Sequence, residues 1–448
     1  MNTWQADVAA GYRKDDFAKL YLETLGASAL RIELWGALVP VVRERWQDIT
    51  WHDFSFEGGG ERGVVTTEVS KTLHAASRGA LRVIATTWSP PPWMKVNGSL
   101  GNGHPKRKNY SLNIDHPIEG GNWTKPLPGE EGAERFRYIA TNKLRHDRYL
   151  HFAKLLVEWT RYFQSLGVTL YALSPTNEPR FSHWFSSCVF NPDEYAELVE
   201  TVAWMFKNQG EPSMRIFGPE HMTWDISGNR RYLEALRERP PALQNLTAIA
   251  SHGYLDGYTT DLRRASPGAF GKFAAPYNKK IWVTEGGFGD HEWPAPLHQL
   301  GASFLYALRD GGVSLLTTWQ TLTSDPPDEH GLMGLKGPTK KTYAAMQFWR
   351  FIRPGMVRIG VDVTGTLDAV AFEDVKLEKT VIVLLNRTRN VSTVSLHLTG
   401  KRLAALESVY LTDASHDCTA VSGWRDTNAL TLPAESIATL VLKTAPAE

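Results

Sequence analysis

Cysteine is scarce in this chain of 448 residues, which contains only Cys188 and Cys418. Two cysteines cannot form the several disulfides of a small secreted scaffold. Neither of them has histidines at the spacing of a metal site. We therefore predict no disulfide framework, no bound metal and no other cofactor.

A strong charge of either sign is also missing, because 49 Lys and Arg residues offset 48 Asp and Glu residues. This balance provides no general attraction to nucleic acids or to an anionic membrane surface. No run of about 18 apolar residues occurs, so we predict that no segment spans a membrane. We expect a monomer without nucleic-acid partners.

The N-terminus lacks the basic and then apolar pattern of a signal peptide. This absence allows two locations. The protein is cytoplasmic if the chain has no leader, and secreted or periplasmic if a leader is missing from this sequence.

Tryptophan, in contrast, is abundant, with 16 residues. Most of these side chains are expected in the core. The others are candidate flat platforms for sugar rings, because an indole packs against C–H groups while its N–H binds a hydroxyl.

Short β-branched runs alternate with amphipathic helical segments from about residue 15 to 350, which predicts parallel strands joined by crossover helices. A closed barrel has eight strands, and seven runs are visible. The remaining one is predicted within residues 1–10 or upstream of Met1, so the first strand is truncated or missing. The seven runs are Ala29–Leu34, Leu81–Thr87, Thr169–Ser174, Met214–Phe217, Leu246–Ser251, Ile281–Glu285 and Val313–Trp319.

Two helices have clear signals in the sequence. Arg148–Leu166 repeats apolar residues at steps of three and four. Asn191 and Pro192 are typical of a helix start, as N-cap and first-turn residue.

Helical periodicity ends at Pro354, and closely spaced alternating runs follow, which indicate an antiparallel β-sandwich. The predicted fold is therefore a (β/α)8 TIM barrel over residues 1–353 with a C-terminal β-sandwich domain over residues 354–448. The sandwich runs are Thr380–Leu385, Val391–Leu398, Val409–Thr412 and Ile437–Leu442.

A glutamate stands at the end of two apolar strand candidates, Glu178 in Ser-Pro-Thr-Asn-Glu-Pro and Glu285 in Trp-Val-Thr-Glu-Gly-Gly. Barrel enzymes carry their chemistry at these strand ends. Cleavage of a β-glycosidic bond needs two carboxyls, one to protonate the leaving oxygen and one to attack the anomeric carbon. We predict that Glu178 is the general acid/base, with Pro179 holding its backbone away from the helical region, and that Glu285 is the nucleophile.

Three further residues are predicted around this pair. Asn177 is expected to bind the sugar 2-hydroxyl. Arg31 is expected to pair with Glu285 and keep it ionised. Glu33 shares a strand face with Arg31, and it is either a sugar ligand or the structural partner of Arg31.

Aromatic and histidine side chains at other strand ends complete the predicted pocket. Trp88 is a candidate wall or a packing residue of its loop, and Trp319 is a candidate floor for the sugar. Tyr254 is a candidate hydrogen-bond donor to the nucleophile. His252 is either a sugar contact or a structural residue, and Glu220 is a candidate lining residue without a direct catalytic role.

The longest irregular region is Pro90–Asn142, and such a loop in a compact domain is usually functional. It is rich in aromatics and could supply extra sugar subsites. Its basic run, Lys106–Lys108, is either a solvated turn or a site for an acidic sugar.

Five segments resemble glycoside hydrolase family 30, a family of retaining β-glycosidases. The resemblance implies a β/α barrel with a C-terminal sandwich, and it places Glu178 at the acid/base position and Glu285 at the nucleophile position. It also places Arg31, Trp88, Asn177, Tyr254 and Trp319 around the cleavage-site sugar, and a sister family of the same clan is an alternative. The segments are Leu30–Leu34, Trp88–Lys95, Leu173–Pro179, Trp282–Gly287 and Phe351–Gly355.

We therefore expect a retaining, endo-acting β-glycoside hydrolase that acts on a polysaccharide or oligosaccharide by double displacement, with its carboxyls about 5–5.5 Å apart. The alternatives are an exo-β-glycosidase, a glucosylceramidase-like enzyme and a non-catalytic carbohydrate-binding derivative. The identity of the sugar and its linkage do not follow from the sequence.

Overall fold

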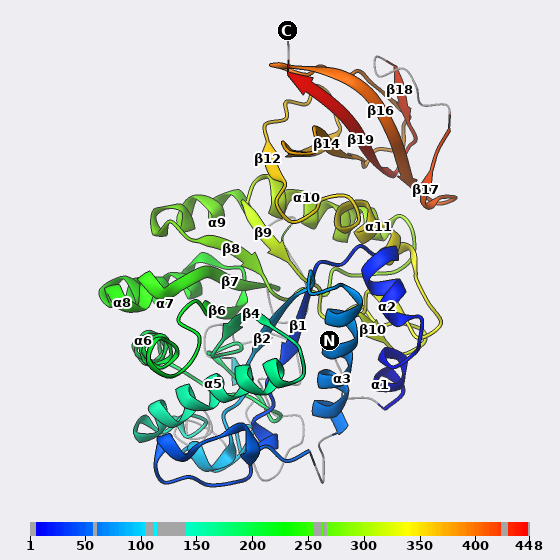
Figure 1. Cartoon of the computed structure of the whole chain (residues 1–448). Coiled ribbons are helices and arrows are strands. Elements are labelled where there is room, and N and C mark those ends of the chain that lie inside the picture. The colour runs from blue at the N-terminus through cyan, green and yellow to red at the C-terminus, as the bar shows by residue number, and fades with distance from the viewer. Residues whose placement is uncertain are drawn as a thin grey trace, which may run out of the picture.

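The computed structural model describes residues 6–56, 61–103, 112–113, 140–254, 262, 267–422 and 429–446. A curled parallel sheet wrapped by helices forms the larger part, and an antiparallel sheet packs above it beside α10 and α11 (Figure 1). The predicted class, a barrel with a C-terminal β-sandwich, is confirmed.

The parallel sheet has the strand order β1-β2-β4-β6-β7-β8-β9. Its strands lie at the seven predicted runs, although β6 and β7 continue further and β8 and β9 end earlier. The strands are β1 (Ala29–Glu33), β2 (Arg82–Thr86), β4 (Leu170–Ser174), β6 (Arg215–Thr223), β7 (Leu246–Tyr254), β8 (Lys280–Val283) and β9 (Val313–Leu316).

The predicted eighth strand is not found where the described residues overlap residues 1–10, because Ala6–Tyr12 forms the helix α1. Residues 1–5 lie outside the described part of the chain. In the part that is described, no further strand joins β1 to β9. The Tyr12 hydroxyl instead accepts a hydrogen bond from the Leu322 N–H at 3.2 Å, which holds α1 against the segment after β9.

Helices cover the outer face of the sheet, with α5, α6, α7 and α8 following one another around it (Figure 1). The two helices predicted from the sequence are present as α5 and α6. Asn191 and Glu194 form the capping box that starts α6. The helices after α1 are α2 (Phe17–Lys19), α3 (Glu61–Ala76), α5 (Tyr149–Ser165), α6 (Pro192–Gln209), α7 (Ile226–Glu238), α8 (Pro240–Asn245), α9 (Pro267–Ala274), α10 (Ala302–Arg309) and α11 (Lys340–Trp349).

Short 3-10 helices and two π-helices, η1 and η8, occur between these elements in the described residues. They are η1 (Leu20–Thr24), η2 (Gly36–Leu38), η3 (Trp46–Asp48), η4 (Trp51–Asp53), η5 (Pro92–Met94), η6 (His146–Arg148), η7 (Ala275–Tyr277) and η8 (Leu297–Gly301). In the described residues, no helix combines the length and the apolar character that a membrane crossing requires.

Successive side chains of a strand point to opposite faces of the sheet, so the apolar residues of the barrel form two clusters. One cluster fills the inside of the curled sheet, as expected for a packed barrel, and the larger one lies between the sheet and the helices. The inner cluster consists of Ile84, Ala172, Phe217, Ala248, Ala250 and Trp282.

The C-terminal part contains a six-stranded antiparallel sheet with the order β12-β13-β14-β19-β16-β17 and a small sheet of β15 and β18. Apolar residues of these strands form a separate core. The strands are β12 (Val357–Ile359), β13 (Asp368–Asp374), β14 (Lys379–Asn386), β15 (Ser392–Val394), β16 (Lys401–Thr412), β17 (Asp417–Ala420), β18 (Leu430–Leu432) and β19 (Ser436–Pro446).

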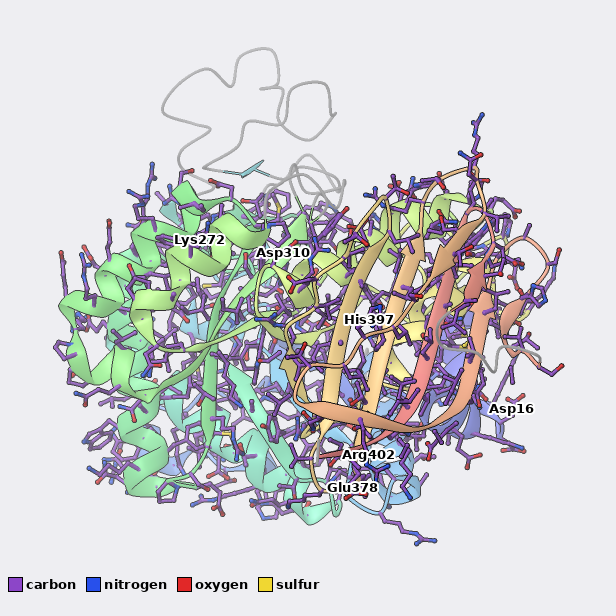
Figure 2. The ribbon with its side chains drawn as sticks, turned by 90° about the horizontal axis from the view of Figure 1, so that it is seen from above. Asp16, Lys272, Asp310, Glu378, His397 and Arg402 are labelled. Carbon is purple, nitrogen blue, oxygen red and sulfur yellow. The ribbon has the colours of Figure 1, made fainter. Side chains whose placement is uncertain are left out.

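Seen from above, the C-terminal part, in which Glu378, His397 and Arg402 are labelled, overlies one side of the barrel and leaves α9 with Lys272 uncovered (Figure 2). Two small strand pairs belong to loops of the barrel. They are β10 (Leu322–Thr323) with β11 (Met333–Gly334), and β3 (Leu112–Asn113) with β5 (Phe181–Ser182).

Candidate active site

Glu178 and Glu285 follow β4 and β8, which are separated by β6 and β7 in the same sheet. Both side chains are nearly buried, with 8% and 5% of their surface exposed. One carboxylate oxygen of each glutamate and one ring nitrogen of His252 lie within 4.8 Å of one another. The structure thus brings together the two carboxyls predicted from the sequence.

The backbone of Glu178 is turned sharply at the end of β4. Its φ is 45°, in the left-handed region that residues other than glycine rarely adopt. Such a conformation costs about 1–3 kcal/mol and persists only where the surroundings hold it. Here the Glu178 N–H donates to the Glu220 carbonyl oxygen at 3.1 Å, which fixes the turn that directs the carboxylate.

Arg31 on β1 is the central cation of the cluster. Its Nη1 donates to Glu285 Oε1 at 2.7 Å, and its Nη2 donates to Asn177 Oδ1 at 2.8 Å. Its Nη2 also lies 2.9 Å from Glu220 Oε1. Since Arg31 is only 6% exposed, these bonds compensate a buried charge and at the same time fix the nucleophile candidate and its neighbouring amide.

His252 at the end of β7 lies between the two catalytic candidates. Its Nδ1 is 2.9 Å from Glu178 Oε1 and 3.4 Å from Glu285 Oε2, and its side chain is fully buried. Its Nε2 is 3.9 Å from Glu220 Oε1. This position brings His252 into contact with the carboxyls themselves.

The histidines and the carboxylates shift one another's pKa values. Burial lowers the pKa of His252, but the charge of Glu285 and the bond with Glu178 outweigh it and raise this pKa to about 9. Burial raises the pKa of Glu178, yet hydrogen bonds from His183 and His252 reverse this and bring it to about 2. These shifts favour a protonated His252 beside an ionised Glu178.

At Glu285, burial is the largest influence on the pKa of the carboxyl. It raises the pKa of this carboxyl, while the charges of His252 and Arg31 counter part of the rise. The Tyr254 side chain is 4% exposed, and burial together with the Glu285 and Glu178 charges raises its pKa, with a hydrogen bond to Glu285 contributing. The structure thus places Tyr254 beside the residue to which it is predicted to donate.

Two indoles line the same cluster. The Trp88 and Trp319 rings have centroids 5.8 Å apart, and the Arg31 guanidinium lies over the Trp88 ring at 4.6 Å. Trp88 is 5% exposed, whereas Trp319 is partly exposed and packs against Phe181, Met222 and Tyr254. Trp319 thus offers more accessible ring surface than Trp88.

Other predicted residues are close but less defined. Asn177 is 3% exposed and bonded to Arg31, as described. Glu33 is 7% exposed on the strand that carries Arg31. Lys106–Lys108 and most of the loop Pro90–Asn142 lie outside the described residues.

The sequence underestimated one participant in the cluster and missed another. Glu220 is fully buried and bonded to Arg31, although its place at the end of β6 suggested only a lining residue. His183 lies 3.1 Å from Glu178 Oε2 through its Nε2. Its strand-end position marked Glu220 as a lining residue, whereas a single loop histidine such as His183 offers no comparable pattern.

A buried acid pair with an arginine, a tyrosine and indoles at the rim of a parallel barrel is the arrangement of a glycoside hydrolase of the β/α-barrel class. Residues 355–440 match the model of the glycosyl hydrolase family 30 beta sandwich domain. Together with the similarities that follow, this match supports glycoside hydrolase family 30 or a related member of its clan.

Glucuronoxylanase XynC of Bacillus subtilis is 23% identical over 335 residues, which cover 70% of this chain and 72% of that protein. A family 30 subfamily 8 xylanase from Clostridium acetobutylicum superposes with a TM-score of 0.70 at 17% identity, covering 98% of this chain and 93% of that one. A family 30 endoxylanase from Clostridium papyrosolvens gives a TM-score of 0.67 at 21% identity, covering 96% and 93%. At these identities, the two solved structures show the fold.

Proposed function

We propose that this protein is a retaining β-glycoside hydrolase that cleaves a β-linked polysaccharide within the chain. The observation that carries the proposal is the approach of Glu178 and Glu285, with oxygens no more than 4.8 Å apart at one end of the sheet. Retaining enzymes hold their carboxyls about 5–5.5 Å apart, whereas inverting ones need about 6.5–9.5 Å to admit a water. The short separation favours double displacement.

In the proposed first step, Glu285 attacks the anomeric carbon and Glu178 protonates the leaving oxygen. Arg31 keeps Glu285 oriented through the bond from its Nη1. The proton reaches Glu178 from His252, whose Nδ1 is 2.9 Å from Glu178 Oε1. In the second step, Glu178 takes a proton from the water that cleaves the glycosyl ester, and this proton restores the charged His252.

In this proposal, the remaining residues have the roles that the sequence predicts for them. Asn177 binds the sugar 2-hydroxyl, Tyr254 donates to Glu285, and Trp319 forms the floor under the sugar, with Trp88 behind it. Glu33 binds a sugar hydroxyl or supports Arg31.

A polysaccharide substrate is supported by the proteins to which the chain is similar, which include a glucuronoxylanase, xylanases and an endo-β1,6-glucanase. We place the catalytic unit at residues 1–353 and the sandwich at residues 354–448, which agrees with a family match that starts at residue 355. We also propose that the enzyme acts as a monomer.

The test is a screen of the purified protein on xylan, glucuronoxylan and β-1,6-glucan, with product masses and the anomeric configuration followed over time. We expect oligosaccharides of several lengths whose new reducing ends first appear in the β configuration. Glu285→Gln should lower kcat by about a thousandfold or more, because it removes the nucleophile. Glu68→Gln, at an exposed ion pair with Arg13, is the matched control and should act like the wild type.

Wild-type rates in Glu285→Gln would leave the protein without this mechanism. Initial products in the α configuration would indicate inversion and would contradict the retaining proposal. Release of single sugars from chain ends would replace endo-action by exo-action.

A further inference from the structure

Glu178 is held by two imidazoles, one on each oxygen of its carboxylate. His252 Nδ1 lies 2.9 Å from Oε1, and His183 Nε2 lies 3.1 Å from Oε2. His252 comes from the end of β7, opposite Glu178, whereas His183 follows Glu178 by five residues in the same loop. Both imidazoles are nearly or fully buried, so water does not compete for these bonds.

The main chain at His183 is fixed on both sides. Its N–H donates to Ser187 Oγ at 3.0 Å, and its carbonyl oxygen accepts from Ser187 Oγ at 3.1 Å. The same carbonyl oxygen accepts from the Asn102 N–H at 2.8 Å. The loop after β4 is thereby tied to the loop after β2 at the residue that contacts Glu178.

The His183 ring is fixed as well, because aromatic side chains lie against it. Its centroid is 3.6 Å from that of Phe181 and 4.1 Å from that of Phe185, which stacks on it at 20°. An imidazole packed in this way has little freedom to rotate. Its Nε2 is therefore directed at Glu178 before any substrate binds.

A buried lysine, Lys95, is hydrogen-bonded to the loop that carries His183. Lys95 Nζ donates to the Ser187 carbonyl oxygen and to Asn142 Oδ1, both at 2.6 Å. Asn142 Nδ2 in turn donates to Ser187 Oγ at 2.9 Å. Three segments far apart in the sequence thus meet at Ser187, the residue that bonds the main chain of His183.

We propose that His183 is a positioning residue that occupies Oε2 of Glu178, so that Oε1 is the oxygen that carries the catalytic proton. This inference rests on the proposed function, in which Glu178 is the acid/base. Burial keeps His183 neutral, since it lowers the pKa of this imidazole. Because an ionised carboxylate only accepts, the bond at Oε2 requires the proton of neutral His183 to sit on Nε2.

Both proton transfers then pass through the same oxygen of Glu178, Oε1. The proton moves from His252 Nδ1 to Glu178 Oε1 and on to the leaving oxygen while the Glu285 ester forms. The attacking water later returns a proton to Oε1 and from there to His252, and Glu285 leaves as a carboxylate. His183 keeps its own proton throughout and holds the carboxyl plane so that Oε1 faces the scissile bond.

The test compares two substrates that differ in their need for an acid, namely xylohexaose and dinitrophenyl β-xylobioside. His183→Phe keeps a ring between Phe181 and Phe185 but removes the donor. A misplaced catalytic group can cost about a hundredfold, so we expect kcat on xylohexaose to fall by about tenfold to a hundredfold. Glycosylation by the dinitrophenyl substrate, whose leaving group needs no proton, should change less than about threefold.

A pH profile provides a readout that mere packing would not move. The bond from His183 favours the ionised form of Glu178, so its loss raises the pKa of the Glu178–His252 pair and shifts the alkaline limb upward. The groups facing Glu178 that stay in place are His252, Glu285 and Tyr254. Behind them, Arg31 stays paired with Glu285, and Glu220 stays beside His252. His183→Gln, whose amide N–H can reach Oε2, should restore both the rate and the limb.

His146→Gln, at an exposed histidine paired with Glu197, is the control and should leave both substrates and the limb unchanged. If His183→Phe does not fold, His183→Asn, whose shorter amide does not reach Oε2, takes its place. Equal effects on both substrates, or none on either, with Glu285→Gln inactive would overturn the positioning role alone. Full activity in Glu285→Gln would instead overturn the proposed function beneath it.

Discussion

Arg31 is the residue on which the geometry of the cluster depends most, because it bonds Glu285, Glu220 and Asn177 from one buried guanidinium. A lysine could not reproduce these bonds, since its ammonium lacks the planar fork of donors. Removing the guanidinium would leave three anionic or polar partners without their shared cation. Its effects should therefore appear in both stability and catalysis.

We predict that Arg31→Gln lowers the free energy of unfolding by about 3–5 kcal/mol, the usual cost of breaking a buried ion pair. The pKa of Glu285 should rise, because the positive charge that favours its ionised form is gone. The acidic limb of kcat/KM would then move to higher pH. Denaturant unfolding curves measure the change in stability, and pH–rate profiles measure the shift of the acidic limb.

The exposed Arg13–Glu68 pair supplies the control, since surface pairs contribute about 0–1 kcal/mol. Arg13→Gln should leave both measurements nearly unchanged. A stable, fully active Arg31→Gln protein would show that Glu285 is oriented by other contacts.

The wild-type pH profile follows from where the proton resides. Burial raises the pKa of Glu285 above its ordinary value of 4.5, so activity should fall at acidic pH as this nucleophile is protonated. The pKa of His252 is about 9, because the Glu285 charge and the bond with Glu178 outweigh burial. Above that pH, the His252–Glu178 pair has lost the proton that the leaving oxygen needs.

We therefore expect a bell-shaped kcat/KM profile with its alkaline limb near pH 9. His252→Asn should move this limb, since the proton then has no imidazole to hold it. An alkaline limb at the same pH in wild type and His252→Asn would contradict storage of the proton on His252.

At the scale of elements, the strand ends were predictable because parallel strands place their carboxyl ends at one edge of a sheet. Glu178, Glu285 and Arg31 could be expected to meet for this reason, and they do. His183 could not, because its position depends on bonds to Asn102 and Ser187 that no periodicity reveals. The eighth strand was expected within residues 1–10 or upstream of Met1, and the described residues of the first range belong to the helix α1 instead.

The loops behind the acid/base share one cation, Lys95, which is 3% exposed and bonded to oxygens of Asn142 and Ser187. Lys95→Met would leave these buried acceptors without a donor, at about 1–3 kcal/mol for each unsatisfied group. We expect a fall in Tm of several degrees and a lower kcat, because the loop carrying His183 loosens. Calorimetry and steady-state kinetics on the same preparation test this.

Lys71→Met on the exposed face of α3 is the matched control and should change neither Tm nor kcat. If Lys95→Met loses stability but keeps its kcat, the lysine has no influence on the active site. Its role is then limited to holding the loops together.

At the scale of the whole molecule, the sandwich is joined to the barrel through buried polar contacts of α11. Thr439 Oγ1 on β19 lies 2.7 Å from the Gln347 carbonyl oxygen, and Gln347 Nε2 donates to Thr412 Oγ1 at 2.8 Å. The Trp293 Nε1 also donates to the Glu435 carbonyl oxygen at 3.0 Å. Buried, satisfied contacts of this kind couple the unfolding of two parts, because separation leaves each group without a partner.

Thr439→Val tests this coupling with little change of shape, since valine replaces the hydroxyl by a methyl group. We expect a loss of about 1–3 kcal/mol in unfolding free energy, with kcat unchanged because the site lies in the barrel. Calorimetry should show one transition in the wild type and a broadened or divided one in the variant. Thr393→Val, at an exposed position on β15, is the control and should leave the single transition intact. An unchanged single transition in Thr439→Val would mean that apolar packing alone couples the sandwich to the barrel.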